Sequence, residues 1–255
     1  MLNIEEKCKK LEEIDLKISP EFFSYENINV PIIQELLILL NSIPRDGLQL
    51  IEDSCIPECV VEKIVCCMPT IREKNRVNNT INFIENEHMP AMRVVMFSIY
   101  LNFIIKKENK YYLTQEANNF VKLTIQEKFI TVFYTMIFKL NLGFLDKWQK
   151  SELIEQSILI ILHSIRDEDT AFRTSKKYTS LLVRKFPQLN ELIQEGIVLE
   201  GYKINRKIDT FSKIIDTRIF HYFLLGMGLV KEQFTRGNDF KYIKSPLLEV
   251  FLEKK

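Results

Sequence analysis

The chain has 255 residues, of which 46% are hydrophobic and 27% charged, a composition that excludes a disordered or fibrous protein. Its seven glycines and eight prolines leave little material for the hairpins of an all-β fold or for a glycine-rich phosphate loop. The net charge of +1 divides into 9 basic and 16 acidic residues in 1–90, and 26 basic and 18 acidic residues in 91–255. This asymmetry fits two solvated surfaces of different composition, and it is also a weak indication of polyanion binding.

The N-terminus and the apolar runs indicate a cytoplasmic protein. Residues 1–10 are rich in charge and lead into no apolar segment, so they do not form a signal peptide. The longest apolar stretch, 91–105, is interrupted by Arg93, Ser98 and Asn102 and is too short to span a bilayer. Five cysteines, an odd number in a chain of this size, favour a reducing compartment.

The first 80 residues predict helices joined by short extended segments. Ser19-Pro20-Glu21 is typical of a helix start, and a broad apolar stripe from Pro31 to Ile43 predicts the next helix. After an extended segment at 48–51, a further helix is predicted from Pro57 towards Pro69. The polar residues 70–80 are the best candidate for a linker.

The remaining chain repeats this order. A helix over 91–105, a charged turn at 106–110, a strand at 111–114 and a helix from Gln115 are predicted first. Helices over 152–165 and 176–186 follow. The end of the chain predicts a helix over 209–225, strands on either side of a turn at 235–239, and a short helix from Pro246.

A helix followed by a two-stranded wing and another helix is the order found in winged-helix domains. It occurs clearly at 91–122 and 209–252, and in reduced form at 31–68. We therefore expect a mainly α protein with small β-hairpins, built from tandem winged-helix-like units. The expected parts are an acidic helical unit at 1–70, a winged-helix-like unit at 71–150, and a helical region at 151–255 that ends in a winged-helix-like unit.

Several short motifs carry a resemblance to a bacterial protein module. They are the block from Val30 to Val65, the segment Lys110-Tyr-Tyr-Leu-Thr-Gln-Glu-Ala117, the stretch Asn141 to Trp148, and the terminal Ser245 to Leu252. Over roughly residues 30–252 the chain resembles the helical C-terminal module of Ri-plasmid open-reading-frame-three-like proteins and of some proteins with a SEC-C metal motif. No activity is established for that module, so the resemblance implies a fold and a bacterial or phage origin.

Four cysteines form a C-x3-C-x6-C-C cluster: Cys55, Cys59, Cys66 and Cys67. Structural zinc sites usually present their thiolates from two loops, and four thiolates along one helix converge poorly on a tetrahedral ion. Free cysteine is also among the most buried residue types. We expect these side chains to pack in the core, with zinc binding and redox sensing as the alternatives.

The sequence contains no recognisable catalytic motif. His88, His163 and His221 stand far apart, and none belongs to an H-E-x-x-H motif; His163 follows an apolar run and is expected to be partly buried. Nucleophile elbows, P-loops and dinucleotide-binding loops are also lacking. The acidic cluster after Arg166 is expected to be a solvated helix end. We accordingly expect neither an enzyme nor a bound cofactor.

Three groups of cations are candidates for nucleic-acid binding. The first is the wing of the central unit, with Lys106, Lys107 and Lys110, where the helix over 91–105 is apolar almost all round and is expected to be buried. The second is the terminal unit, where we expect Lys213, Arg218 and His221 to be exposed on the helix and Arg236 to lie at the wing tip. The third is the segment with Arg173, Lys176 and Lys177, together with Arg184 and Lys185. A pI of about 7.6 is too low to be diagnostic of nucleic-acid binding.

The favoured interpretation is a non-catalytic interaction or regulatory module that acts through contacts with an unidentified protein partner. The 18 phenylalanines and nine tyrosines supply anchor residues for such contacts. The alternative is a transcriptional-type regulator that binds double-stranded DNA through the C-terminal winged unit. No membrane partner is expected, and association between copies of the chain is left open.

Overall fold

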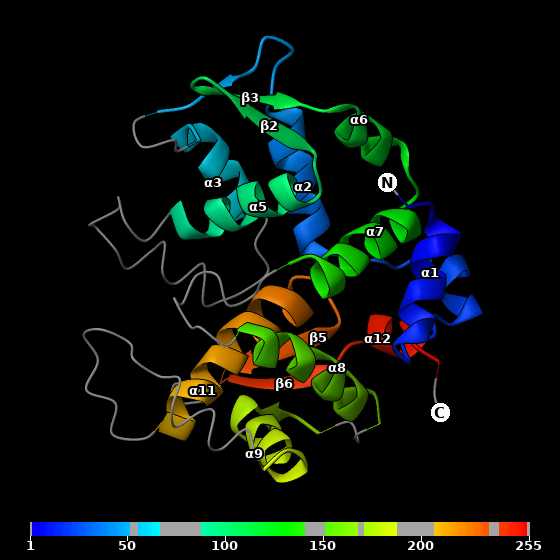
Figure 1. The fold of residues 1–255 in the computed structure, drawn as a ribbon. Helices are drawn as coiled ribbons and strands as arrows, with labels where there is room; N and C mark the ends of the chain where they lie inside the picture. Colours follow the sequence, from blue (N-terminus) through cyan, green and yellow to red (C-terminus); the bar gives the residue numbers. More distant parts are fainter. Residues whose placement is uncertain are drawn as a thin grey trace. The chain divides into compact units, whose positions relative to one another are not determined.

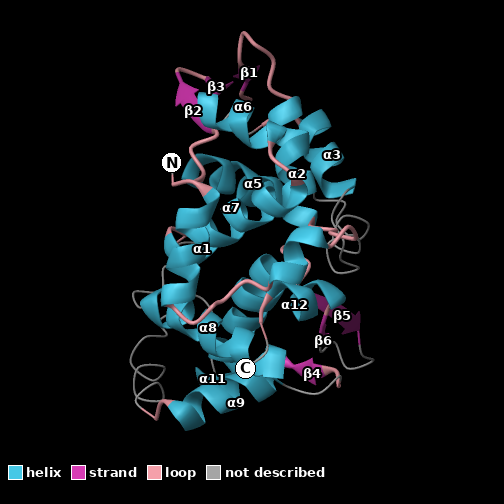
Figure 2. Cartoon of the chain, turned by 90° about the vertical axis from the view of Figure 1, so that its right-hand side faces the viewer, coloured by secondary structure: helices cyan, strands magenta, loops and turns pink. Residues whose placement is uncertain are grey.

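A computed structural model of the chain describes residues 2–51, 56–66, 88–140, 151–167, 171–187, 207–234 and 240–253 (Figure 1). Contacts divide the chain into two compact units. Unit 1 comprises Met1–Lys7 and Ile28–Phe138, and unit 2 comprises Cys8–Asn27 and Lys139–Lys255. The described residues are mainly helical, and their strands form two small antiparallel sheets (Figure 2), which confirms the predicted fold class. Within the described ranges, no helix is both long enough and apolar enough to cross a membrane.

Unit 1 begins with residues 4–7 of helix α1 (Ile4–Glu13), which ends in unit 2. The other elements of unit 1 are α2 (Pro31–Asn41), β1 (Leu48–Gln49), α3 (Glu58–Cys66), α5 (His88–Tyr100), β2 (Ile104–Lys107), β3 (Lys110–Leu113), α6 (Gln115–Lys122) and α7 (Ile125–Phe138). Helix α2 has a proline in its first turn, and Ile32, Ile33, Leu36, Leu39 and Leu40 recur at helical spacing and are buried. The strand order in the sheet is β1-β3-β2.

Unit 2 has the same order of elements after a short 3-10 helix, η1 (Pro20–Ser24). They are α8 (Ser151–Asp167), β4 (Arg173–Thr174), α9 (Ser175–Lys185), α11 (Lys207–Ile215), the π-helical segment η4 (Asp216–Leu225), β5 (Val230–Phe234), β6 (Phe240–Lys244) and α12 (Pro246–Phe251). The strand order is β4-β6-β5. In each unit the first, short strand therefore pairs with the last strand of the wing, as in a winged helix.

This pairing corrects the predicted domain boundaries. Leu48 of β1 pairs with Tyr111 of β3, so the reduced unit expected at 31–68 and the winged unit expected at 91–122 belong to one compact unit and share one three-stranded sheet. The boundary predicted at 70/71 falls inside unit 1. A pairing over about 60 residues leaves no trace in local periodicity, which explains the error. The linker predicted at 70–80 and the turn at 235–239 lie outside the described residues.

The helix predicted over 91–105 is also shorter than expected, because it ends at Tyr100 and Ile104 already belongs to β2. Asn102 has a φ of 58°, in the left-handed region that ends helices. Gly228 has a φ of 69° at the equivalent place in unit 2. The residues that follow, Phe103 in unit 1 and Leu229 in unit 2, each donate the backbone N–H to the carbonyl oxygen five residues earlier. The N···O distances are 2.7 and 2.8 Å. When an apolar run continues from a helix into a strand, the hydrophobic pattern does not indicate the residue at which the helix ends.

One hydroxyl in each unit ties this helix end to the element after the wing. The Thr114 Oγ1 hydroxyl donates to the carbonyl of Asn102 at 2.6 Å, and the Ser245 hydroxyl donates to the carbonyl of Gly228 at 2.6 Å. The same hydroxyl oxygen accepts a hydrogen bond from the backbone N–H of the residue three positions later in the chain, at 3.3 Å in both units. It thereby caps the N-termini of α6 and α12. The backbone N–H groups of Thr114 and Ser245 donate to the carbonyl oxygen of the residue that follows the left-handed residue, at 2.9 and 3.0 Å. The two units thus share one hydrogen-bond network.

Unit 1 also holds a buried ion pair between helices α2 and α5. Arg93 of α5 donates to Glu35 of α2 at 2.6 Å, and their side chains are 7% and 0% exposed. A buried carboxylate and guanidinium are costly to desolvate, so the loss of either partner leaves an uncompensated charge in the core. The pair therefore fixes α5 against α2.

We expect Thr114→Val and Ser245→Ala each to lower the free energy of unfolding by about 1–2 kcal/mol, because both remove a helix cap and leave a carbonyl without its donor. Urea denaturation followed by circular dichroism measures this change. Thr114→Ser, which keeps the hydroxyl, is the matched control and should stay close to wild type. Equal losses in Thr114→Ser and Thr114→Val would contradict the assigned role of the hydroxyl.

Glu35→Leu and Arg93→Leu should each lower the free energy of unfolding by about 3–5 kcal/mol, since each leaves its partner buried and charged. The double variant should be more stable than either single variant, and a double-mutant cycle measures the coupling. Glu249→Gln, which breaks the half-exposed pair with Lys244, serves as the control with an expected loss below about 1 kcal/mol. Additive losses in the cycle would contradict a direct interaction.

Candidate nucleic-acid interface

The densest positive charge of the described structure lies on β4 and α9 of unit 2. Residues 171–187 contain five basic residues and no acidic one. Arg173, Lys176, Arg184 and Lys185 are exposed, and Lys177 is half-buried. We call these five residues the α9 surface. The structure thus places the third predicted group of cations, with Arg184 and Lys185 included, on one strand and the helix that follows it.

The start of α9 is arranged against the usual rule for helix ends. Its N-cap, Thr174, makes no side-chain cap hydrogen bond, and the first turn has no acidic residue but contains Lys176 and Lys177. Cations at this end oppose the helix dipole, whose positive end favours an anion. Thr174 also pairs with Lys241 of the neighbouring strand β6, which brings a further cation beside the helix start. The potential at this end of α9 is therefore strongly positive.

A row of aromatic rings holds α9 and β6 in place. The ring of Phe220 in η4 lies 5.0 Å from that of Tyr178 in α9 and 4.4 Å from that of Tyr242 in β6. The Tyr242 hydroxyl donates to Asp216 Oδ1 at 2.9 Å. These contacts bury the inner face of α9 and leave its basic residues on the outer face.

The structure corrects the surface predicted on the helix before the terminal wing. Lys213 of α11 is exposed as expected, but Arg218 and His221 are only 5% and 6% exposed. The Arg218 guanidinium lies over the ring of Tyr222, 5.3 Å from its centre. The segment from Asp216 is π-helical, so its side chains do not follow the 3.6-residue period used for the prediction. Arg236 lies outside the described residues.

The lysines of the first wing lie on strands rather than in the predicted turn. Lys106 and Lys107 are exposed at the end of β2, and half-buried Lys110 begins β3. Lys107 pairs directly with Lys110 across the hairpin. The Lys110 ammonium donates to the backbone carbonyl of Asp46 at 3.3 Å. The helix before this wing, α5, buries Val94, Val95 and Phe97, as expected.

Several other cations are engaged within the fold. Lys17 pairs with Glu253 at 2.9 Å, and the hydrogen bond that its ammonium donates to this carboxylate raises the pKa of the lysine. Lys244 pairs with Glu249 at 3.3 Å. Burial lowers the pKa of Lys128, whose ammonium donates to the carbonyl of Leu123. These lysines contribute less to the surface charge than the α9 surface does.

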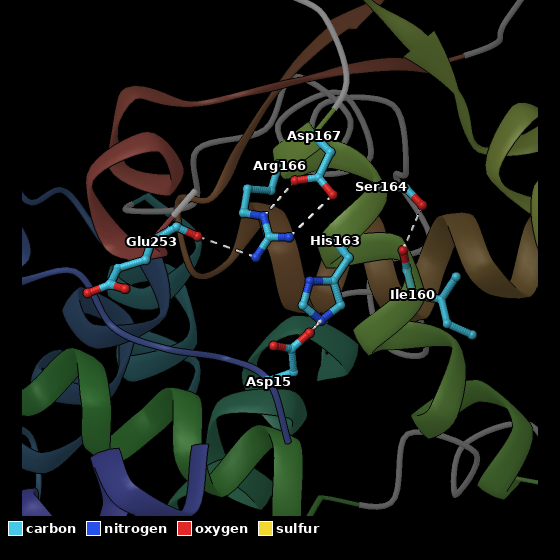
Figure 3. A network of polar contacts seen from close by, with 7 residues as sticks. All are labelled: Asp15, Ile160, His163, Ser164, Arg166, Asp167 and Glu253. Carbon is cyan, nitrogen blue, oxygen red and sulfur yellow. Dashed lines mark hydrogen bonds and ion pairs between the residues drawn. The ribbon is translucent and has the colours of Figure 1, made fainter. Parts of the chain in front are cut away.

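A separate polar network connects the ends of the chain in unit 2 (Figure 3). Arg166 of α8 contacts Asp167 at 2.7 Å and the carbonyl of Glu253 at 3.4 Å. His163, 23% exposed, lies 3.7 Å from the Asp15 carboxylate, so its imidazole is partly buried and has a polar neighbour, as expected. These contacts join α8 to segments near both ends of the chain, which gives the network a structural role.

The cysteines of α3 are not packed in the core as predicted. Cys59 and Cys66 are exposed, because Val60, Val61 and Ile64 occupy the buried face of the helix. Cys55 and Cys67 lie outside the described residues. Within the described ranges, no three His, Cys, Asp or Glu side chains gather in a group that could hold a metal ion.

Because Cys59 and Cys66 are exposed, we expect both thiols to react rapidly with Ellman's reagent in the native protein. The variant C59S/C66S should lose two equivalents of rapidly reacting thiol per chain. Cys8→Ser, which replaces a half-buried cysteine, is the control and should leave that rapid phase unchanged. An unaltered rapid phase in C59S/C66S would contradict the exposure of these side chains.

Comparisons with protein-family models, curated proteins and solved structures gave no match for this chain. The resemblance to the helical C-terminal module of plasmid-type proteins therefore stays a prediction from the sequence. A functional conclusion for this chain accordingly depends on the exposure, charge and position of its own residues.

Proposed function

We propose that this protein is a non-catalytic DNA-binding protein whose unit 2 contacts the phosphate backbone of duplex DNA through the α9 surface. The observation that carries the proposal is the collection of five cations without an acidic residue on β4 and α9. Backbone phosphates supply most of the affinity in sequence-independent DNA binding, and lysine and arginine are their usual partners.

The position of α9 in the fold supports this role. In helix-turn-helix domains the first helix of the pair crosses the DNA backbone and the second enters the major groove. Helix α9 precedes α11 in the order of unit 2 and thus has the place of the backbone-crossing helix. From Lys176 to Arg184 the helix rises about 12 Å, which matches three to four phosphates at 3.4 Å of axial rise per nucleotide.

The described part of the following helix supports backbone-led rather than base-led binding. A helix that reads bases presents Arg, Lys, Asn or Gln to the groove. In residues 211–225, Arg218 is buried against Tyr222, while Lys213 is exposed. The proposed contact therefore moves from the predicted Arg218 and Arg236 to the α9 surface.

The distribution of exposed apolar side chains gives less support to docking of a protein partner, which stays a prediction from the sequence. A protein-binding surface gathers large apolar residues at its centre. The large exposed apolar residues of the described chain are spread over different helices, strands and turns: Phe23, Ile51, Ile99, Ile105, Val121, Phe138 and Phe172.

We expect the protein to bind a 20-base-pair duplex with a strong dependence on salt. Contacts with three to five phosphates give a slope of about −2.7 to −4.5 in a plot of log affinity against log salt, or roughly a 40- to 500-fold loss between 50 and 200 mM. Fluorescence anisotropy at a series of salt concentrations measures this slope. Affinity that is independent of salt, or no binding at low salt, would refute the proposal.

The variant K176A/K177A should weaken binding at least tenfold at low salt and make the slope shallower by about 2, because each lysine accounts for about one phosphate contact. K9A/K10A is the matched control, since it removes the same charge from exposed positions of α1. The control should bind like wild type. Equal weakening in both variants would show that net charge, and not the α9 surface, drives binding.

A further inference from the structure

We infer that unit 1 carries a second duplex-binding surface on its wing, so that one chain binds two DNA segments. This inference rests on the proposed function and extends it from unit 2 to unit 1. The surface consists of Lys107 and Lys110 on the paired strands of the wing, with Gln49 beside them on β1, and we call it the unit 1 wing surface.

The shared hydrogen-bond network fixes which residues of the two sheets are equivalent. Tyr111 and Tyr242 each stand three residues before the capping hydroxyl, are 6% and 1% exposed, and pair with the first strand of their sheet. Each is preceded by a lysine, Lys110 in unit 1 and Lys241 in unit 2. Successive residues of a strand point to opposite faces, so both lysines lie on the face away from the buried tyrosine.

The neighbours of these two lysines are also alike. In unit 1 the row across the sheet is Gln49, Lys110 and Lys107. In unit 2 the corresponding row is Thr174, Lys241 and Gln233. Both outer faces thus present an ammonium group, a usual partner of phosphate oxygens. In unit 1 the side-chain amide of Gln49 donates to the carbonyl of Asn109 at 3.2 Å, so the lysines supply the donors there. The row in unit 2 adjoins the start of α9, where DNA binding is proposed.

The first wing places two positive charges directly opposite each other. Like charges at paired positions of an antiparallel sheet destabilise it. The hydrogen bond from Lys110 to the Asp46 carbonyl does not cancel the charge, and Lys107 is exposed. A phosphate bound between the two ammonium groups would convert this repulsion into an attraction.

The helix of unit 1 that corresponds to α9 cannot take over this contact. Helix α3 exposes Glu58 and Glu62 beside a single exposed cation, Lys63, so its charge is net negative and repels a phosphate backbone. Of the two elements that approach the backbone in a winged helix, only the wing of unit 1 therefore has a suitable charge in the described structure.

Lysines on the edge strand β2 also discourage pairing with another sheet, and this role must be distinguished from binding. The variant K107E/K110E keeps the edge charged but repels phosphate. A protective role predicts unchanged DNA binding for this variant, whereas the unit 1 wing surface predicts a loss. K107Q/K110Q removes the charge without reversing it and relieves the lysine repulsion. K107E/K110E replaces that repulsion with a similar one between two carboxylates, so neither variant adds a like-charge repulsion that the wild-type wing lacks, and the fold should be retained in both.

The test is the number of 10-base-pair duplexes bound per chain at low salt, measured by isothermal titration calorimetry and native mass spectrometry. We expect wild type and the K9Q/K10Q control to bind two duplexes. K107E/K110E and K107Q/K110Q should bind one, with unit 2 affinity changed less than threefold. K176Q/K177Q should retain one duplex, and its further combination with K107Q/K110Q should bind none.

The outcomes separate this inference from the proposed function. If wild type binds one duplex, and K107E/K110E binds it equally well, the unit 1 wing surface is wrong while unit 2 binding stands. If K107E/K110E still binds two duplexes, these lysines do not contact DNA and the inference falls. If wild type binds no duplex at low salt, both the proposed function and the inference are refuted.

Discussion

The arrangement of each unit depends on the hydroxyl of one residue, Thr114 in unit 1 and Ser245 in unit 2. This hydroxyl donates to the carbonyl of a left-handed residue at the end of one helix and caps the start of the next. The wing lies between these two helices in the sequence, so its strands are fixed at their base. A change of one residue in the strand register would turn every outward side chain inward. The hydroxyl thus determines which charges the wing presents.

That fixed register explains why the two units carry their positive charge at different places of one architecture. In unit 2 the outer row of the sheet continues into α9, where four cations follow without an acidic residue. In unit 1 the helix in the same place is α3, which exposes Glu58 and Glu62, and the lysines gather on the hairpin instead. The shared architecture therefore limits phosphate contacts to the wing and the helix after the first strand, while the charged residues at these places differ between the two units.

Periodicity predicted most helices and both hairpins because these depend on contacts between near neighbours. It could not predict that the two-residue strands β1 and β4 join the hairpins, since each is recognisable only by its distant partner. The burial of Arg218 was missed because a π-helical segment departs from the period that the sequence was tested for. One signal for the repeat was present: Lys-Tyr-x2-Thr-x5-Phe at 110–120 corresponds to Lys-Tyr-x2-Ser-x5-Phe at 241–251. Both phenylalanines are buried.

The near-neutral net charge does not conflict with DNA binding, because a phosphate responds to charge over a short distance. At physiological salt the Debye length is about 8 Å, which corresponds to about five residues along a helix at 1.5 Å each. Within five residues of the middle of α9 the only charged residues of the sequence are cations, although the whole protein carries +1. The pI averages over charges that salt screens from one another. Phosphate binding therefore depends on the charged residues of α9 itself, which the buried row of aromatic rings holds on the outer face of the helix, and not on the net charge of the protein.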